Sequence, residues 1–366
     1  MTPAPVETTR KGYVSSLTFD IPSAAADWDP RASGSDVEVT GAGRQLRKTA
    51  CAMVGEGADA SVVGRLVALT IDAMTCRLIE LAIARLGEPP VPWSWLALGS
   101  AARLEQAIAT DQDHALAFDP QGRPLEELDR YFLQLARSVT AGLEAAGIPR
   151  CRADVVAENP SLRRPLDHWV EAFNRWMGDP GISSVRQASV LFDIRRVAGP
   201  LDAERTLREV IRSSSRRPEF LRQFAAQSVD VRPPGDRFRG ASILLQGSRG
   251  AKLDIKRGGL TPIVNLARSY AIEAGVMESG TLARLDHARE LGRLHESARS
   301  HLAEAFQLFW RIRLKHQARC VEDGRPADDL VELRCLGASE RKQLRDALLT
   351  IRRAQHSLRR EHGLSA

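Results

Sequence analysis

The chain has 366 residues, of which 43% are hydrophobic and 27% charged, and its formal net charge is +6. This composition is typical of a globular protein, and the length allows two domains. No apolar run approaches the roughly 18 to 20 residues that a membrane span needs, which argues against a membrane protein. The first 30 residues include Asp20, Asp27 and Asp29 and lack a compact apolar stretch. They do not resemble a signal peptide, and we expect a cytoplasmic location.

The cysteines and the positive charge each bear on the class of protein. The five cysteines are scattered, without a Cys-x-x-Cys pair, which argues against a disulfide framework and a structural zinc site. A positive net charge is compatible with nucleic-acid binding, but aromatic residues make up only 5% of the chain and leave few rings for stacking on bases. A polyanionic small substrate such as a nucleoside triphosphate accounts for the charge equally well.

The N-terminal part of the chain predicts a loose arm followed by alternating helices and short strands. Residues 1–45 are rich in Ala, Pro, Ser, Gly and Thr with little periodicity, which predicts the arm. The apolar spacing then predicts these elements in order: one long helix or two short ones over about 59–86, a buried strand over 93–98, a helix over 101–109, a strand over 114–118, and helices over 125–146 and 161–177.

The C-terminal part is predicted to be mainly helical. Residues 189–197 read as a last strand, and helical patterns dominate after Pro200. One hairpin is expected, pairing 242–245 with 252–255, and about four helices follow residue 260, with loops near Gly280 and at 322–338. We therefore predict an α+β protein: a small mixed-sheet domain over 46–200, with leading helices, followed by an all-α helical bundle over 225–366.

Residues 95–118, WLALGSAARLEQAIATDQDHALAF, concentrate the chemically informative residues. A strand that ends in Gly99-Ser100 and leads into a helix can present backbone N–H groups and a hydroxyl to a phosphate. Asp111 and Asp113 follow on an extended segment, where positions i and i+2 face the same way. Two adjacent carboxylates are suitable ligands for a Mg²⁺ ion carried by a triphosphate. Either motif alone is common; their order and spacing together are more specific.

This segment resembles the Gly-Ser … Asp-x-Asp signature of the DNA polymerase beta-type nucleotidyltransferases. It is similar to the bacterial enzymes that modify the PII signal protein and glutamine synthetase. It resembles more closely a family of nucleotidyltransferases with a dedicated C-terminal substrate-binding domain, over most of residues 55–360. The strings that carry the resemblance are Leu98-Gly-Ser-x-x-Arg103-x-Glu105-Gln106, Thr110-Asp-Gln-Asp113, Asn159-Pro160, Phe192-Asp-x-Arg195 and Asp254-x-Lys-Arg-Gly-Gly259.

The resemblance implies a function and further site residues. The reaction would move an NMP from an NTP donor to an acceptor hydroxyl and release pyrophosphate, with two Mg²⁺ ions held by Asp111, Asp113 and a third carboxylate, Asp193. Asp193 would also orient or deprotonate the acceptor. Arg103 and Lys256 would join Gly99 and Ser100 in binding the nucleotide. The implied acceptor is a protein side chain, as in the uridylylation of PII in signal transduction.

Structural alternatives exist for these additional residues. Asp193 could pair with Arg195 or Arg196 at a strand end, Arg103 could be an exposed helix residue, and Lys256 could belong to a simple strand-to-helix turn. Cys151-Arg-Ala-Asp154 stands where the resembled family has Cys-Pro-Gly-Gly, and loss of the glycines could narrow the site. A catalytically weak nucleotide-sensing module is therefore one alternative function. A nucleotidyltransferase acting on nucleic-acid ends is another, and the few aromatic residues argue against it.

Overall fold

The computed structural model describes residues 36–178, 189–231 and 251–364. Its N-terminal half is built on a four-stranded mixed sheet in the order β3-β2-β1-β4. The strands are β1 (Trp93–Leu98), β2 (His114–Phe118), β3 (Arg163–Pro165) and β4 (Ile194–Ala198). β1 pairs antiparallel with β2 and β4, whereas β2 pairs parallel with β3. Every residue of β1 and β2 is buried, so helices must cover both faces of the sheet.

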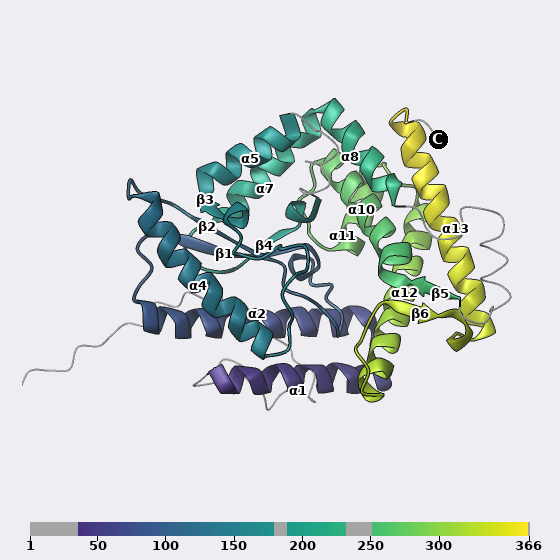
Figure 1. Ribbon diagram of the computed structural model, residues 1–366. Coiled ribbons are helices and arrows are strands. Elements are labelled where there is room, and N and C mark those ends of the chain that lie inside the picture. Colours follow the sequence, from purple (N-terminus) through teal and green to yellow (C-terminus); the bar gives the residue numbers. More distant parts are fainter. Residues whose placement is uncertain (1–35, 179–188, 232–250, 365–366) are drawn as a thin grey trace, which may run out of the picture.

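The two faces of the sheet pack into separate apolar cores. Trp93 and Trp95 of β1 belong to one core and Leu96 and Leu98 to the other, as expected when side chains alternate along a strand. In Figure 1 one face is covered by α2 and α4, with α1 beneath them, and the opposite face by α5 and α7. These helices are α1 (Asp36–Gly55), α2 (Ala60–Leu86), α4 (Leu125–Ala145), α5 (Leu166–Gly178) and α7 (Ala203–Ser213).

The C-terminal half is a helical bundle that packs directly on the first half. Its helices are α8 (Pro218–Asp230), α10 (Thr261–Ala274), α11 (Thr281–Glu290), α12 (Glu296–Glu322) and α13 (Ala338–Glu361). The short antiparallel strands β5 (Lys252–Asp254) and β6 (Leu330–Glu332) lie at its edge (Figure 1). Buried residues of α1, α2, α10, α12 and α13 form one continuous core. The bundle is therefore joined to the sheet domain by apolar packing as well as by the chain.

Much of the predicted architecture is confirmed. The α+β class, the mixed sheet in the first half and the helical second half agree with the structure. The strands over 93–98 and 114–118 are present as predicted, and so are the long helices α2 and α4 and the four helices after residue 260. Of the helices in the described part of the chain, none has the length and apolar composition needed to cross a membrane.

Several predicted elements differ from the observed ones. The predicted arm over 1–45 overlaps α1, which begins at Asp36; residues 1–35 lie outside the described part. Val39, Ala42 and Leu46 of α1 are buried, so tertiary packing stabilises a helix whose Gly and Thr residues give it weak intrinsic propensity. The predicted strand over 189–197 is a 3₁₀ turn, η4 (Ser189–Phe192), followed by β4.

The predicted hairpin has a different partner. Residues 242–245 lie outside the described residues, and β5 pairs instead with β6, in a stretch that was expected to be a loop. Residues of β6 lie 76 or more positions from their partners in β5, so this pairing leaves no local signal in the sequence and depends on the tertiary arrangement.

The predicted helix over 161–177 begins only at Leu166. It follows a 3₁₀ turn, η3 (Pro160–Leu162), and β3.

Gly64 of α2 tests the packing between the two halves. A Cβ at Gly64 would overlap the ring of Trp310 in α12, whereas a Cβ at Gly41 of α1 would meet no atom within 4 Å. Gly64→Ala should therefore lower the free energy of unfolding by about 1 to 3 kcal/mol, as overpacking does in other cores. The matched control Gly41→Ala should leave it unchanged or raise it by up to about 1 kcal/mol. Equal effects of the two substitutions in urea unfolding would contradict this packing.

Candidate active site

Asp111 and Asp113 lie on the extended segment that leads into β2. The Leu98 N–H donates to the Asp113 carbonyl at 3.0 Å, which continues the sheet pairing by one residue. The intervening Gln112 side chain is buried on the other side, where its amide donates to Thr140 O at 3.2 Å and Ile148 O at 2.8 Å. The carboxylates of Asp111 and Asp113 consequently point the same way, as the i, i+2 spacing predicts.

Asp113 is largely buried and lies next to a second carboxylate. One ligand atom each from Asp111, Asp113 and Cys151 lies within 4.8 Å of the others. Burial, reinforced by the charge of Asp111, raises the pKa of Asp113 to about 6, although Lys256 and Arg103 act in the opposite direction. Burial and the Asp113 charge raise the pKa of the Cys151 thiol to about 11. The thiol is therefore protonated at neutral pH, and the oxygen atoms are the available ligands for a hard cation.

Gly99 allows the chain to turn tightly beside this pair. Its φ of +54° lies in the left-handed region, which side chains other than glycine rarely adopt. A Cβ at this position would lie 3.4 Å from Oδ2 of Asp113 and 3.2 Å from Cγ1 of Val190. The next helix, α3 (Gly99–Ala102), is a single turn rather than the longer helix predicted. Its dipole is correspondingly small, so nearby cations and the Ser100 hydroxyl are the stronger anion ligands here.

A cleft of about 490 Å³ lies between the two halves of the protein. Its walls come from the turn after β1, from Asp113, and from the helices α8, α10 and α12. The polar side chains among its lining residues include Ser100, Arg103, Glu105, Asp113, Lys256, Asn265, Arg268 and Arg313. The cleft thus places an acidic corner next to several cationic side chains.

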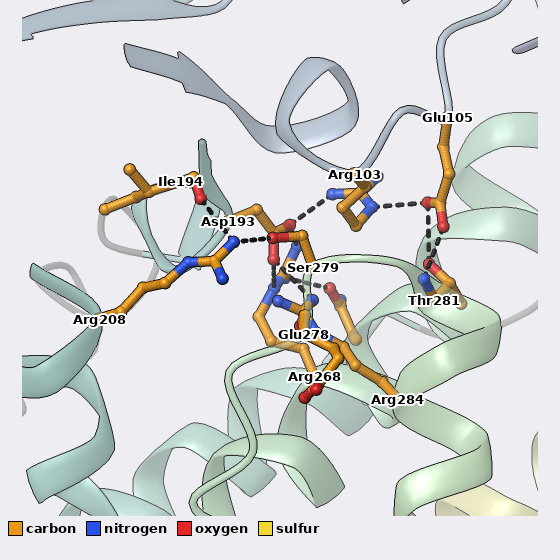
Figure 2. A network of polar contacts seen from close by, with 11 residues as sticks. Arg103, Glu105, Asp193, Ile194, Arg208, Arg268, Glu278, Ser279, Thr281 and Arg284 are labelled. Atoms are coloured by element: carbon orange, nitrogen blue, oxygen red, sulfur yellow. Dashed lines mark hydrogen bonds and ion pairs between the residues drawn. The ribbon is translucent and has the colours of Figure 1, made fainter. Parts of the chain in front are cut away.

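Asp193 occupies a different environment from the one expected of a third metal ligand. Its side chain is completely buried, and Arg268 contacts its two oxygens at 3.3 and 2.5 Å. Arg284 contacts it at 2.6 Å, and Arg103 also forms an ion pair with it (Figure 2). Burial alone would raise the pKa of Asp193, but these three arginines hold it far below its usual range.

The structure therefore does not place Asp193 in the group of potential metal ligands formed by Asp111 and Asp113. The local ion pair considered as the alternative is also absent within the described residues, because Arg195 binds Asp72 of α2 at 2.8 Å. The reason is tertiary: Arg268 and Arg284 come from α10 and α11 in the C-terminal half. Sequence reasoning did not single out these two arginines. One usable signal was present, since Arg268 lies four residues from both Val264 and Ile272 in a helix that is otherwise largely apolar in sequence.

The other two cations expected at the site also line the cleft. Arg103 donates from Nε to Glu105 at 2.6 Å, and Glu105 in turn accepts from the backbone N–H and hydroxyl of Thr281 at 2.6 and 2.8 Å. Arg103 is therefore held in place rather than exposed. Lys256 begins a short helical segment, η6 (Lys256–Leu260), and its side chain is exposed on the same cleft as Asp113.

The substituted string Cys151-Arg-Ala-Asp154 is accommodated without closing the cleft. Asp154 has a φ of +58°, a left-handed conformation that would be unstrained for glycine. Its side chain accepts a hydrogen bond from Arg150 at 2.9 Å and its carbonyl accepts one from Asn159 at 3.1 Å. Arg152, Ala153 and Asp154 are not among the residues that line the cleft.

Comparison with known proteins agrees with this arrangement. The family Putative nucleotidyltransferase DUF294 matches residues 44–182, which include the sheet domain up to α5. The Putative nucleotidyltransferase substrate binding domain matches residues 218–362, which include the helical bundle. Together the two matches cover most of the chain, and the protein belongs to this nucleotidyltransferase family. No curated protein matches the chain.

The raised pKa of Asp113 predicts how pH affects metal binding. A cation needs the ionised carboxylate, so Mg²⁺ affinity measured by calorimetry should fall about tenfold per pH unit below pH 6. The pKa of Asp113 is higher in the folded, metal-free protein than in the unfolded chain. Protonation of Asp113 therefore contributes to the stability of the metal-free protein below about pH 4, and this contribution is lost as the pH rises through 6. Asp113→Asn should abolish both effects; a pH-independent Mg²⁺ affinity between pH 5 and about 7 would contradict the assignment.

The arginine-bound carboxylate makes a separate prediction about stability. Asp193→Asn removes the shared partner of three buried guanidinium groups and should cost about 3 to 5 kcal/mol of unfolding free energy without any metal present. If Asp193 were mainly a metal ligand, Asp193→Asn would instead leave the free energy of unfolding unchanged or raise it in the absence of metal, because the substitution would remove repulsion between neighbouring carboxylates. Urea unfolding in EDTA measures the difference, and a variant as stable as the wild type would contradict the observed contacts.

Proposed function

We propose that this nucleotidyltransferase is Mg²⁺-dependent and transfers an NMP from an NTP to an acceptor hydroxyl. The observation that carries the proposal is the pair of carboxylates of Asp111 and Asp113 beside the Gly99 turn, with Asp113 lining a cleft whose other walls supply arginine and lysine side chains. An acidic corner next to a cationic surface is complementary to a metal-bound triphosphate.

The carboxylate pair fits a Mg²⁺ ion. Mg²⁺ is typically bound through one or two carboxylates, with the remaining ligands supplied by substrate phosphates and water. The two acids provide such a set, and the raised pKa of Asp113 indicates that a positive ligand would be stabilising there. When bound, the ion would neutralise charge on the phosphate that is attacked and on the departing oxygen. Both acids are proposed metal ligands and catalytic residues.

The remaining cleft residues hold and orient the donor. The Ser100 hydroxyl and the side chains of Arg103 and Lys256 lie along the cleft beside Asp113, where they can hydrogen-bond phosphate oxygens. The acceptor oxygen then attacks the α-phosphorus, and the bond from that phosphorus to the oxygen of the β-phosphate breaks. Pyrophosphate leaves with the bonding electrons, and the acceptor proton passes to water. Positioning and charge neutralisation supply most of the rate enhancement in such a reaction.

The proposal also names an acceptor and a cellular setting. By the resemblance to the PII-modifying enzymes, the acceptor is a hydroxyl on a protein, and the reaction serves cytoplasmic signalling. The helical bundle that forms one wall of the cleft belongs to a family described as a substrate binding domain. It is the surface on which such an acceptor would dock. Incubation with each labelled NTP, Mg²⁺ and host lysate, followed by mass spectrometry, would identify the modified species and the nucleotide.

One observation favours a second candidate function. Three arginines engage Asp193. Of the three carboxylates that a two-metal mechanism was expected to use, this leaves Asp111 and Asp113 close together as potential metal ligands. A module that binds NTP and Mg²⁺ to sense them, without transfer, would need only the remaining pair. Pyrophosphate release separates the two functions: a sensor binds both ligands and releases none.

Substitution of the paired acids tests the transferase directly. Asp111→Asn and Asp113→Asn should each reduce nucleotide transfer by at least about 10³-fold, the scale on which loss of a main transition-state charge stabiliser acts. Their melting temperatures without metal should equal or exceed that of the wild type, since repulsion is relieved. Asp119→Asn, at the opposite end of β2, is the matched control and should retain full activity. Wild-type turnover in either site variant would overturn the assignment.

A further inference from the structure

Three arginines from both halves of the protein converge on one buried carboxylate. Arg103 belongs to the sheet domain, whereas Arg268 and Arg284 lie on α10 and α11 of the bundle. Figure 2 shows their guanidinium groups pointing toward Asp193. The side chains of the three arginines are only 10%, 6% and 5% exposed, so water screens them poorly.

This cluster carries more positive than negative charge. Within the described residues, its two anions are Asp193 and Glu105, and Glu105 contacts only one of the three guanidinium groups. A buried surplus charge is costly unless a counter-ion accompanies it. The cluster is therefore suited to accept one more anion.

Two of the arginines can reach a ligand while still bound to Asp193. Arg103 and Arg268 line the cleft, beside Gly99 and Ser100. Arg103 uses Nε and Nη1 for Glu105 and Asp193, and within the described part of the chain its Nη2 has no hydrogen-bond partner. Arg268 uses Nε and Nη2 for Asp193 and one donor of Nη1 for Asn265. A guanidinium group has five N–H donors, so both arginines retain donors that Asp193 does not occupy.

We propose that Arg103 and Arg268 form a polyphosphate-binding site that spans the two domains. It takes the β- and γ-phosphates of the nucleoside triphosphate, and this part of the inference rests on the proposed function. Asp193 is then a positioning residue: it fixes both guanidinium groups in one orientation without binding the donor or the metal. Guanidinium pairs match phosphate oxygens in geometry as well as charge. The bundle therefore contributes to donor binding as well as to the acceptor surface.

Binding of tripolyphosphate in EDTA tests this site without requiring catalysis or metal. Calorimetry at constant ionic strength should give an affinity that Arg268→Gln weakens about 10- to 100-fold, the range for loss of a charged hydrogen-bond donor. Arg268→Gln should fold, because it removes the surplus cation rather than its counter-ion. Arg334→Gln, an exposed arginine outside the cleft, is the matched control and should bind like the wild type. Orthophosphate, which has fewer oxygens and less negative charge than tripolyphosphate, should bind more weakly.

The role of Asp193 has its own readout. If it positions the arginines, Asp193→Asn should weaken tripolyphosphate binding, so tripolyphosphate should raise the melting temperature of Asp193→Asn less than that of the wild type. A larger rise in Asp193→Asn would mean that Asp193 competes with the ligand for the arginines, and would overturn the positioning role. Orthophosphate at equal ionic strength should not reproduce the effect. Equal shifts in the two proteins would overturn the positioning role, and this comparison needs only a protein that shows a melting transition.

Failure of the inference and failure of the transferase proposal are distinguishable. Wild-type tripolyphosphate affinity in Arg268→Gln, or an equal loss in Arg334→Gln, overturns the site whatever the enzyme assay shows. If transfer occurs and the KM for NTP is unchanged in Arg268→Gln, the inference fails while the function stands. If no NTP is ever consumed but the Arg268-dependent binding persists, the polyphosphate site stands and the transferase proposal fails.

Discussion

The contact on which the rest of the structure depends is the carboxylate of Asp193 surrounded by Arg103, Arg268 and Arg284. Its backbone carbonyl also accepts a hydrogen bond from Gly99 N–H at 3.1 Å, so the same residue fixes the tight turn after β1. Asp193 thus ties the turn, the start of β4 and two helices of the bundle to one point. Because an unpaired buried charge is strongly unfavourable, these parts are stable only when they are assembled together.

This constraint explains the shape of the candidate active site. The turn at Gly99 brings the backbone against Asp113, while the arginines hold the bundle close enough to form the facing wall of the cleft. At one corner burial and the charge of Asp111 raise the pKa of Asp113, and beside the other corner three buried guanidinium groups share the carboxylate of Asp193. The proposed ligand, a metal-bound triphosphate, would present positive charge to the acids and negative charge to the arginines. Its charges are therefore complementary to those of the cleft.

The sequence predicted what depends on local patterns. The strand over 93–98, the long helices α2 and α4, and the parallel orientation of Asp111 and Asp113 all follow from residue periodicity. The predictions failed where distant packing decides the outcome. α1 has weak propensity and is stabilised by burial of Val39 and Leu46, and β5 pairs with β6, far away in the sequence. The contacts of Asp193 likewise could not be predicted from local patterns, since its arginine partners lie 75 or more residues away in the sequence, on both sides of it.

The most direct test of this account is a crystal structure with Mn²⁺ and a non-hydrolysable nucleoside triphosphate, using the anomalous signal to locate the metal. The account predicts Mn²⁺ on Asp111 and Asp113, the terminal phosphates against Arg103 and Arg268, and Asp193 still bound by its three arginines. Mn²⁺ coordinated by Asp193, with the arginines displaced, would contradict the division of roles proposed for these residues. A triphosphate bound outside the cleft would contradict the proposed function itself.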